Sequence, residues 1–175
     1  MKPDFRKILT DSLRMTIDIA TESVDGKLEY FEDVLNLAIG DEAPLNMRAS
    51  RVIALLVDKY HGLLMPFVDE IANLFPNFNT DGQKRSFAYV LSKYVNRLNE
   101  DNQAKMIDVC FDYMLLNEKV AVKYNCMKFL FQMTELYPEL CGELQSAIDF
   151  NLKKGIFRMN GEIKKIYKTI NTPSY

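Results

Sequence analysis

Apolar residues recur at helical spacing along almost the whole chain. Val52, Leu56 and Tyr60, for example, are each four residues apart, and this spacing places their side chains on one face of a helix. Strand-like alternation of apolar and polar residues between turn residues is absent from the sequence. The pattern therefore predicts an all-α protein.

Helix-breaking and helix-capping residues divide this pattern into about eight helices. Pro44 and Pro66 suit the first turn of a helix, whereas Gly40 and Gly62 suit the position that follows one. Capping side chains are expected at Thr80, Asn117 and Asn160, and the segment "NED" at residues 99–101 is expected to start a further helix. Helices are expected over residues 3–22, 28–39, 44–60, 66–75, 83–98, 100–116, 118–137 and 138–152, with a further one that ends near Ile170.

The starts of these helices follow a regular rhythm. Shorter helices begin near residues 28, 65, 100 and 138, at intervals of 37, 35 and 38 residues, and a longer helix lies between each pair. A period near 37 residues that contains two helices is typical of an α-α solenoid, in which each unit buries its apolar face against its neighbours. A shift of 75 residues also aligns apolar and basic residues of the segments that begin at Leu45 and Val120.

Two segments resemble the HEAT repeat. In "IGDEAPLNMRASRVIALL" an Asp in the turn precedes an apolar-basic pair, Met47-Arg48, and then an apolar stripe. "NEKVAVKYNCMKFL" repeats the pattern with Val122-Lys123, although Asn117 replaces the turn acid, and "NTDGQKRSFAYVL" matches loosely. The resemblance implies an armadillo-type, right-handed α-α superhelix of about three and a half helix pairs. It also implies that the second helix of each pair lines the concave face.

We expect a single domain over residues 1–175, because this length buries roughly two thirds of the unfolded surface. Residues 1–27 are expected to form an N-terminal capping helix, residues 28–152 the HEAT-like repeats, and residues 153–175 a basic C-terminal capping helix and tail.

Charge is segregated between the two kinds of predicted helix. The shorter helices carry one cation, Lys105, against twelve acids, whereas the longer helices carry ten cations against three acids. Residues 153–168 add six cations against Glu162. The formal net charge of −2 therefore conceals a basic set of helices, which would attract an acidic peptide, nucleic-acid phosphates or a membrane surface.

The cations of the longer helices are the candidate partner-binding residues. Arg48, Arg51 and Lys59 lie within about 80° of one another around their helix, so they form a basic stripe. Arg48 and Lys123 also have a structural interpretation, since acids of the repeat turns, such as Asp41 for Arg48, are suited to ion pairs with them. The full candidate set is Arg51, Lys59, Lys93, Arg97, Lys128, Arg48 and Lys123.

Residues that perform catalysis or bind cofactors are scarce. His61 is the only histidine, and its position beside Gly62 at a helix end favours a structural role. Cys110, Cys126 and Cys141 fit neither a disulfide framework nor a zinc site, and we interpret them as buried apolar residues in a reducing compartment. No nucleotide-binding, hydrolase or calcium-loop motif occurs. We therefore expect no enzyme activity, cofactor or metal.

Neither a signal-peptide core nor a membrane span of about 20 apolar residues is present, so we expect a cytoplasmic protein. The leading hypothesis is a protein-interaction or scaffold module that binds an acidic partner on the basic face of its second helices. Two alternatives are nucleic-acid binding, similar to HEAT-like DNA glycosylases, and self-association through exposed repeat ends. The isoelectric point near 5.5 and the absence of tryptophan argue against the first alternative.

Overall fold

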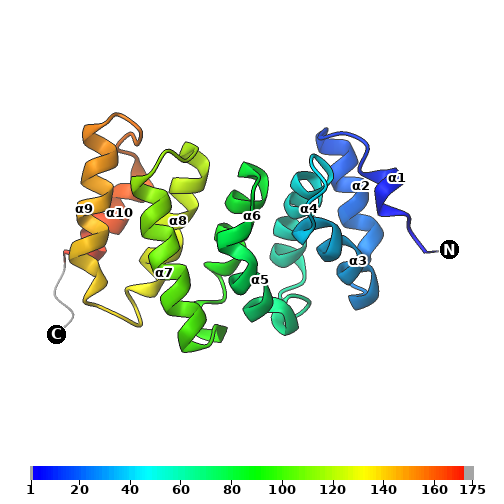
Figure 1. Ribbon diagram of the computed structural model, residues 1–175, viewed down its shortest axis with the longest axis horizontal. Helices are drawn as coiled ribbons and strands as arrows, with labels where there is room; N and C mark the ends of the chain where they lie inside the picture. Colours follow the sequence, from blue (N-terminus) through cyan, green and yellow to red (C-terminus); the bar gives the residue numbers. More distant parts are fainter. Residues whose placement is uncertain (1, 172–175) are drawn as a thin grey trace.

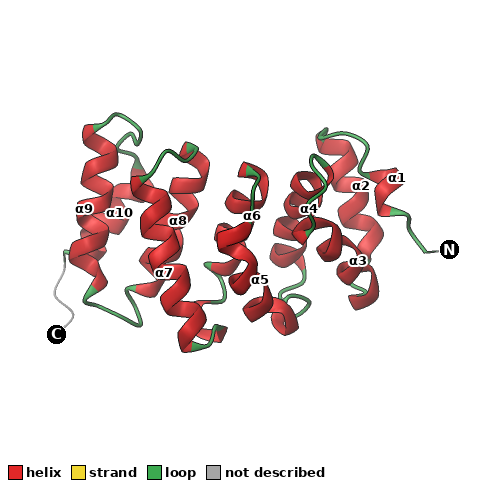
Figure 2. Cartoon of the chain, in the orientation of Figure 1, coloured by secondary structure: helices red, strands yellow, loops and turns green. Residues whose placement is uncertain are grey.

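The computed structural model describes residues 2–171, which form ten α-helices and three short 3-10 helices and contain no strand (Figures 1 and 2). In chain order the elements are α1 (Phe5–Ile8), α2 (Arg14–Val24), α3 (Leu28–Ile39), α4 (Leu45–Lys59), η1 (Met65–Phe67), α5 (Val68–Leu74), η2 (Phe75–Asn77), α6 (Asp81–Leu91), η3 (Val95–Arg97), α7 (Glu100–Leu115), α8 (Val120–Met133), α9 (Leu140–Lys153) and α10 (Gly161–Ile170).

The helices stack in two rows along the length of the molecule, with α1 and α9 near opposite ends (Figure 1). The first helices of the pairs, α3, α5, α7 and α9, form one row. The second helices form the other row, in which α2 packs on α4, α4 on α6, and α6 on α8. The arrangement confirms the predicted all-α superhelix, with ten α-helices in residues 2–171 where about eight were expected.

A continuous apolar core lies between the two rows. Phe31, Phe75, Phe87 and Phe129 come from three successive helix pairs and are completely buried. Burial of each such ring contributes about 1.5–3 kcal/mol to stability. Because these side chains belong to one connected cluster, each unit is stabilised by its neighbours, as is typical of a solenoid.

Two of the three predicted N-terminal caps, Thr80 and Asn160, are confirmed, and Asn99 also caps the helix whose start was predicted there. The side chains of Thr80, Asn99 and Asn160 each accept a hydrogen bond from the backbone N–H three residues later. The cap predicted at Asn117 is wrong, because α8 begins only at Val120 and follows Lys119 without a capping side chain.

The end of α3 is closed by side chains from other parts of the chain. Asn46 and Gln83 each donate to the carbonyl of Gly40 at 3.0 Å, and Gln83 also donates to the carbonyl of Ala38 at 2.9 Å. Gly40 has φ −71° and ψ 174°, so the expected glycine cap in the left-handed conformation is not formed. The two amides satisfy the carbonyls that such a cap would otherwise satisfy.

The helix predicted over residues 3–22 is divided into α1 and α2. Between them the carboxylate of Asp11 accepts a hydrogen bond from the backbone N–H of Leu13 at 2.9 Å. This local turn competes with a continuous helix, and it allows the chain to change direction before Arg14.

The helix predicted over residues 83–98 ends early, at Leu91. The following turn allows the Tyr94 hydroxyl to donate to the carbonyl of His61 at 2.7 Å, which joins this turn to the end of α4. The predicted alternation of shorter and longer helices is therefore wrong in its lengths: α6 has 11 residues, whereas α7 in the first row has 16.

Candidate functional site

The second-helix row presents a polar surface formed by five successive helices, α2, α4, α6, α8 and α10. We call this surface the second-helix face. Its members used below are Glu22, Arg51, Asp58, Lys59, Arg85, Tyr89, Lys93, Asn125, Lys128 and Glu162.

Three of the candidate cations form ion pairs with acids on the neighbouring second helix. Lys59 on α4 lies 3.1 Å from Glu22 on α2, and Lys128 on α8 lies 3.0 Å from Glu162 on α10. Lys93, just after α6, pairs with Asp58 on α4. We call these three contacts the seam pairs, because each bridges the boundary between two units. Exposed pairs of this kind are each worth roughly 0–1 kcal/mol.

Two of the seam lysines, Lys59 and Lys93, have pKa values raised above the ordinary lysine value, which favours their charged form. Hydrogen bonds to Glu22 and Tyr60 raise the pKa of Lys59. Burial lowers the pKa of Lys93, but hydrogen bonds to Asp58 and Tyr89 outweigh it, and the pKa is raised. These lysines are therefore fully charged at neutral pH, with their charges already matched within the protein.

The ion pair expected between Arg48 and Asp41 is not formed. Arg48 instead donates to the carbonyl of Leu9 at 2.9 Å and to the Ser12 hydroxyl at 3.4 Å. The guanidinium thus closes the C-terminal end of α1, whose last carbonyls lack helical partners. This contact ties the first helix pair to α4.

Lys123 is buried, with 2% of its surface exposed. Its ammonium donates to the carbonyl of Met114 at 2.7 Å and to that of Leu116 at 2.6 Å, at the C-terminal end of α7. Burial, and secondarily the charge of Lys154, lower the pKa of Lys123. The structure therefore places Lys123 inside the fold and away from the second-helix face.

A fourth ion pair, between Lys84 and Glu118, is more enclosed than the seam pairs. The two charges are 2.5 Å apart, and the side chains are only 17% and 15% exposed. The Lys84 ammonium also lies 4.7 Å from the centre of the Tyr113 ring. Burial, and secondarily the charge of Glu118, raise the pKa of Tyr113 to about 12, so its hydroxyl stays neutral beside the pair.

Arg97 lies outside the second helix on which it was expected, because α6 ends at Leu91. It is exposed on η3 and lines a hollow of about 790 Å³ with His61, Met65 and Tyr94. His61 is itself exposed, and its backbone carbonyl accepts the hydrogen bond from Tyr94. Arg97 is therefore at one edge of the molecule, beside the turn that follows α4.

Arg51 and Arg85 line one hollow of about 470 Å³ between α4, α6 and α8. Arg51 makes one long hydrogen bond, of 3.4 Å, to the carbonyl of Ser12. Within residues 2–171 the guanidinium of Arg85 makes neither a hydrogen bond nor an ion pair. Sequence reasoning did not select Arg85 as a site residue. The sequence feature that could have identified Arg85 is its position 34 residues after Arg51, which is close to one repeat period.

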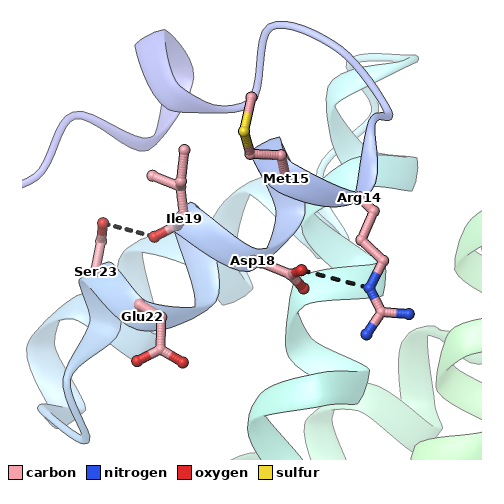
Figure 3. Close-up of a pocket in the computed structure, with 6 residues that line it drawn as sticks. All are labelled: Arg14, Met15, Asp18, Ile19, Glu22 and Ser23. Atoms are coloured by element: carbon pink, nitrogen blue, oxygen red, sulfur yellow. Dashed lines mark hydrogen bonds and ion pairs between the residues drawn. The ribbon is translucent and has the colours of Figure 1, made fainter.

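A second exposed surface lies on α2 at the end of the solenoid. Leu13, Met15 and Ile19 are 61%, 68% and 50% exposed. Figure 3 shows Met15 and Ile19 projecting from the helix, with the Arg14–Asp18 ion pair, at 3.4 Å, beside them. Sequence analysis did not single out this apolar surface, because isolated apolar residues in an amphipathic helix are indistinguishable from core residues.

Between residues 2 and 171, no group of three or more His, Cys, Asp or Glu side chains is arranged to hold a metal ion. Cys110 and Cys126 are buried, as expected, whereas Cys141 is only partly buried, and all three are free thiols. Burial raises the pKa of Cys110, which keeps it protonated. None of the helices described is long and apolar enough to cross a membrane.

Comparison with known proteins gives one match. The family model for the HEAT repeat domain matches residues 5–169, which is nearly the whole chain. No curated protein and no solved structure matches the sequence significantly. Domains built from HEAT repeats generally mediate protein–protein interaction or serve as scaffolds, and they are typically non-enzymatic.

Proposed function

The chain belongs to the HEAT repeat domain family, and on this premise we propose that it is a non-enzymatic interaction module that binds an acidic segment of a partner protein. The partner lies along the second-helix face. Arg51 and Arg85 on that face and Arg97 at its edge supply the charge that attracts it, while Lys59, Lys93 and Lys128 border the contact. Arg48 and Lys123 act by holding the repeats together.

One observation carries this proposal: the second-helix face presents arginines whose charge the protein itself does not match. The seam pairs neutralise Lys59, Lys93 and Lys128, but Arg51 and Arg85 have no carboxylate beside them. Because a cation without a counter-charge gains most from an external anion, this part of the face favours an acidic ligand.

The same observation disfavours a nucleic acid as the partner. A phosphate backbone that follows the row would pass Glu22, Asp58 and Glu162, the acids of the seam pairs. Affinity for nucleic acid comes mainly from many phosphate contacts, and acids spaced along the path oppose them. A short acidic protein segment requires fewer cations.

The test is capture of partner proteins by immobilised protein, followed by mass spectrometry. The variant R51Q/K59Q/R85Q/R97Q removes four cations of the second-helix face and its edge, including both arginines that have no counter-charge. A matched control, K7Q/K119Q/K153Q/R158Q, makes the same change of net charge at exposed positions outside the seam pairs. Circular dichroism establishes that both variants retain the helical fold.

We expect the control to capture the same proteins as the wild type and the first variant to lose them. Equal capture by both variants would show that the second-helix face is not the binding surface. Captured material that disappears after nuclease treatment would instead assign the face to nucleic acid.

A further inference from the structure

Arg51 and Arg85 are the same kind of side chain, on neighbouring helices, facing one hollow. Arg51 is on α4 and Arg85 is on α6, and α4 packs directly on α6. The remaining lining residues are Ala54, Ser86, Tyr89 and Asn125. The hollow therefore combines two cationic donors with a small apolar floor and few competing groups.

The polar neighbours of the two arginines are already engaged. The Tyr89 hydroxyl donates to both carboxylate oxygens of Asp58, each at 3.0 Å. Asn125 on α8 donates to the backbone carbonyl of Arg85 at 2.9 Å, which fixes the backbone of α6 against α8. Neither group neutralises a guanidinium. Apart from the long hydrogen bond of Arg51 to the carbonyl of Ser12, the guanidinium donors of Arg51 and Arg85 have no partner among residues 2–171.

Arg51 and Arg85 differ from the lysines of the seam pairs because they have no acidic partner. At the α2–α4 boundary Lys59 meets Glu22, and at the α4–α6 boundary Lys93 meets Asp58. Arg51 and Arg85 each lie eight residues before the seam lysine of the same unit, and they line one hollow whose lining contains no acid. Two like charges on adjacent helices repel one another, and a bound carboxylate would remove that repulsion.

We propose that Arg51 and Arg85 form a carboxylate clamp, which takes an acidic side chain of the partner's bound segment. This inference rests on the proposed function and adds the point of contact and its chemistry. A guanidinium presents a planar fork of donors that matches the two oxygens of a carboxylate. Two forks on adjacent helices fit an Asp or Glu, or a pair of them, and Asn125 fixes the backbone from which the second fork extends.

The clamp is testable with a defined probe, a hexaglutamate peptide with blocked termini. Nitrogen-15 labelling of arginine gives an NMR signal for the Nε–H group of each side chain, and the variants R51Q and R85Q assign the two signals. We expect saturable shifts at Arg51 and Arg85, with little change at the exposed control residue Arg158. Added salt should weaken the binding, because the site is open to solvent.

Single substitutions then measure how much each arginine contributes to peptide binding. R51Q and R85Q should each weaken peptide binding about tenfold, since each removes charge-assisted hydrogen bonds. R51K and R85K keep the charge but lose the fork, and we expect them to fall between the wild type and the Gln variants. R158Q, at the exposed control residue, should bind within about twofold of the wild type, because Arg158 is not a member of the second-helix face.

Three outcomes would overturn the clamp. The first is that the peptide shifts the Nε–H signals of all arginines equally, or shifts none of them. The second is stronger binding of an oligonucleotide of equal charge, or of vesicles that contain phosphatidylserine, than of the peptide. The third is loss of binding in R97Q but not in R85Q, which would leave the proposed function intact and move the acidic contact to the other hollow.

Discussion

The ammonium of Lys123 binds the carbonyl of Leu116 at 2.6 Å inside the protein, where a surface cation had been expected. The same ammonium binds the carbonyl of Met114, so one lysine closes the C-terminal end of α7. Asn151 on α9 also donates to the Met114 carbonyl, at 3.0 Å, and thereby connects three helices at this point. The contact is part of the fold, and stability measurements will register its loss.

Replacement of Lys123 by Ala should destabilise the protein by about 2–3 kcal/mol, because the carbonyls of Met114 and Leu116 each lose a hydrogen bond from a buried ammonium. For a chain of this length the melting temperature should fall by roughly 4–12 °C. Thermal unfolding followed by circular dichroism measures the change. The exposed neighbour Lys119 is the control, and its replacement by Ala should change stability by less than about 0.5 kcal/mol. Equal effects at the two positions would contradict the structural role of Lys123.

The enclosed pair Lys84–Glu118 should show a larger coupling energy than an exposed seam pair. A double-mutant cycle with K84M and E118Q is expected to give about 1–2 kcal/mol, because both side chains are largely withdrawn from water. The Lys59–Glu22 pair, whose side chains are 44% and 72% exposed, provides the comparison and should give at most about 0.5 kcal/mol. Urea denaturation supplies the free energies of unfolding. Similar coupling in the two pairs would show that enclosure has no effect here.

Gly82 is required because α4 and α6 approach closely at this residue. A Cβ atom at position 82 would lie 2.8 Å from Cβ and 3.2 Å from Cα of Met47. G82A should therefore destabilise the protein by about 1–2 kcal/mol, even though Ala favours a helix over Gly by about 1 kcal/mol. In α9, nothing lies within 4 Å of the corresponding atom at Gly142, and G142A should stabilise the protein by about 0.5–1 kcal/mol. Urea denaturation should show that G82A lowers the free energy of unfolding and that G142A raises it. Stabilisation by both substitutions would contradict the close approach of α4 and α6 at Gly82.

Asp69 should make the stability of the protein depend on pH in the acidic range. Its carboxylate accepts hydrogen bonds from the side chain of Asn102 at 2.8 Å and from the backbone N–H of Asn99 at 3.0 Å. The bond from Asn102 is the main cause of its lowered pKa, and it outweighs the opposing effect of burial. A carboxyl whose pKa is lower in the folded state stabilises the fold above its ordinary pKa of about 3.9, and this contribution is lost as the pH falls through the lowered value.

The substitution D69N should therefore cost about 1 kcal/mol at pH 7, and this cost should shrink as the pH falls below about 4. Urea denaturation at several pH values measures it. The exposed neighbour Glu70 is the control, because E70Q should alter stability by less than about 0.5 kcal/mol at every pH. If the difference in free energy of unfolding between D69N and the wild type does not change with pH, the proposed contribution of Asp69 to the pH dependence is wrong.

The sequence was informative where the determining interactions are local. The caps at Thr80, Asn99 and Asn160 involve residues three positions apart, and the alternation of helix pairs follows from apolar spacing. The HEAT-like segments correctly indicated the family, which the match over residues 5–169 shows. The division of residues 3–22 was missed, although the signal, an Asp11 side chain two residues before Leu13, is also local.

The roles of the cations depended on contacts that the sequence does not display. Lys59 and Glu22 are 37 residues apart, and the carbonyls bound by Lys123 have no side chain that could mark them. The early end of α6, which moved Arg97 away from the second-helix row, depends on the long-range contact between Tyr94 and His61. The partners of charged side chains therefore required the packed structure.

The separation of acids in the first row from cations in the second gives the molecule an electric dipole across its narrow dimension. An anionic protein that diffuses nearby would exert a torque on this dipole and turn the arginine-bearing side toward itself before any atoms touch. Such orientation acts over roughly a Debye length, about 8 Å at physiological ionic strength, so it accelerates encounter more than it prolongs residence. Recognition by this small solenoid would thus begin in solution, with the direction of approach set by how its charges are divided between two rows of helices.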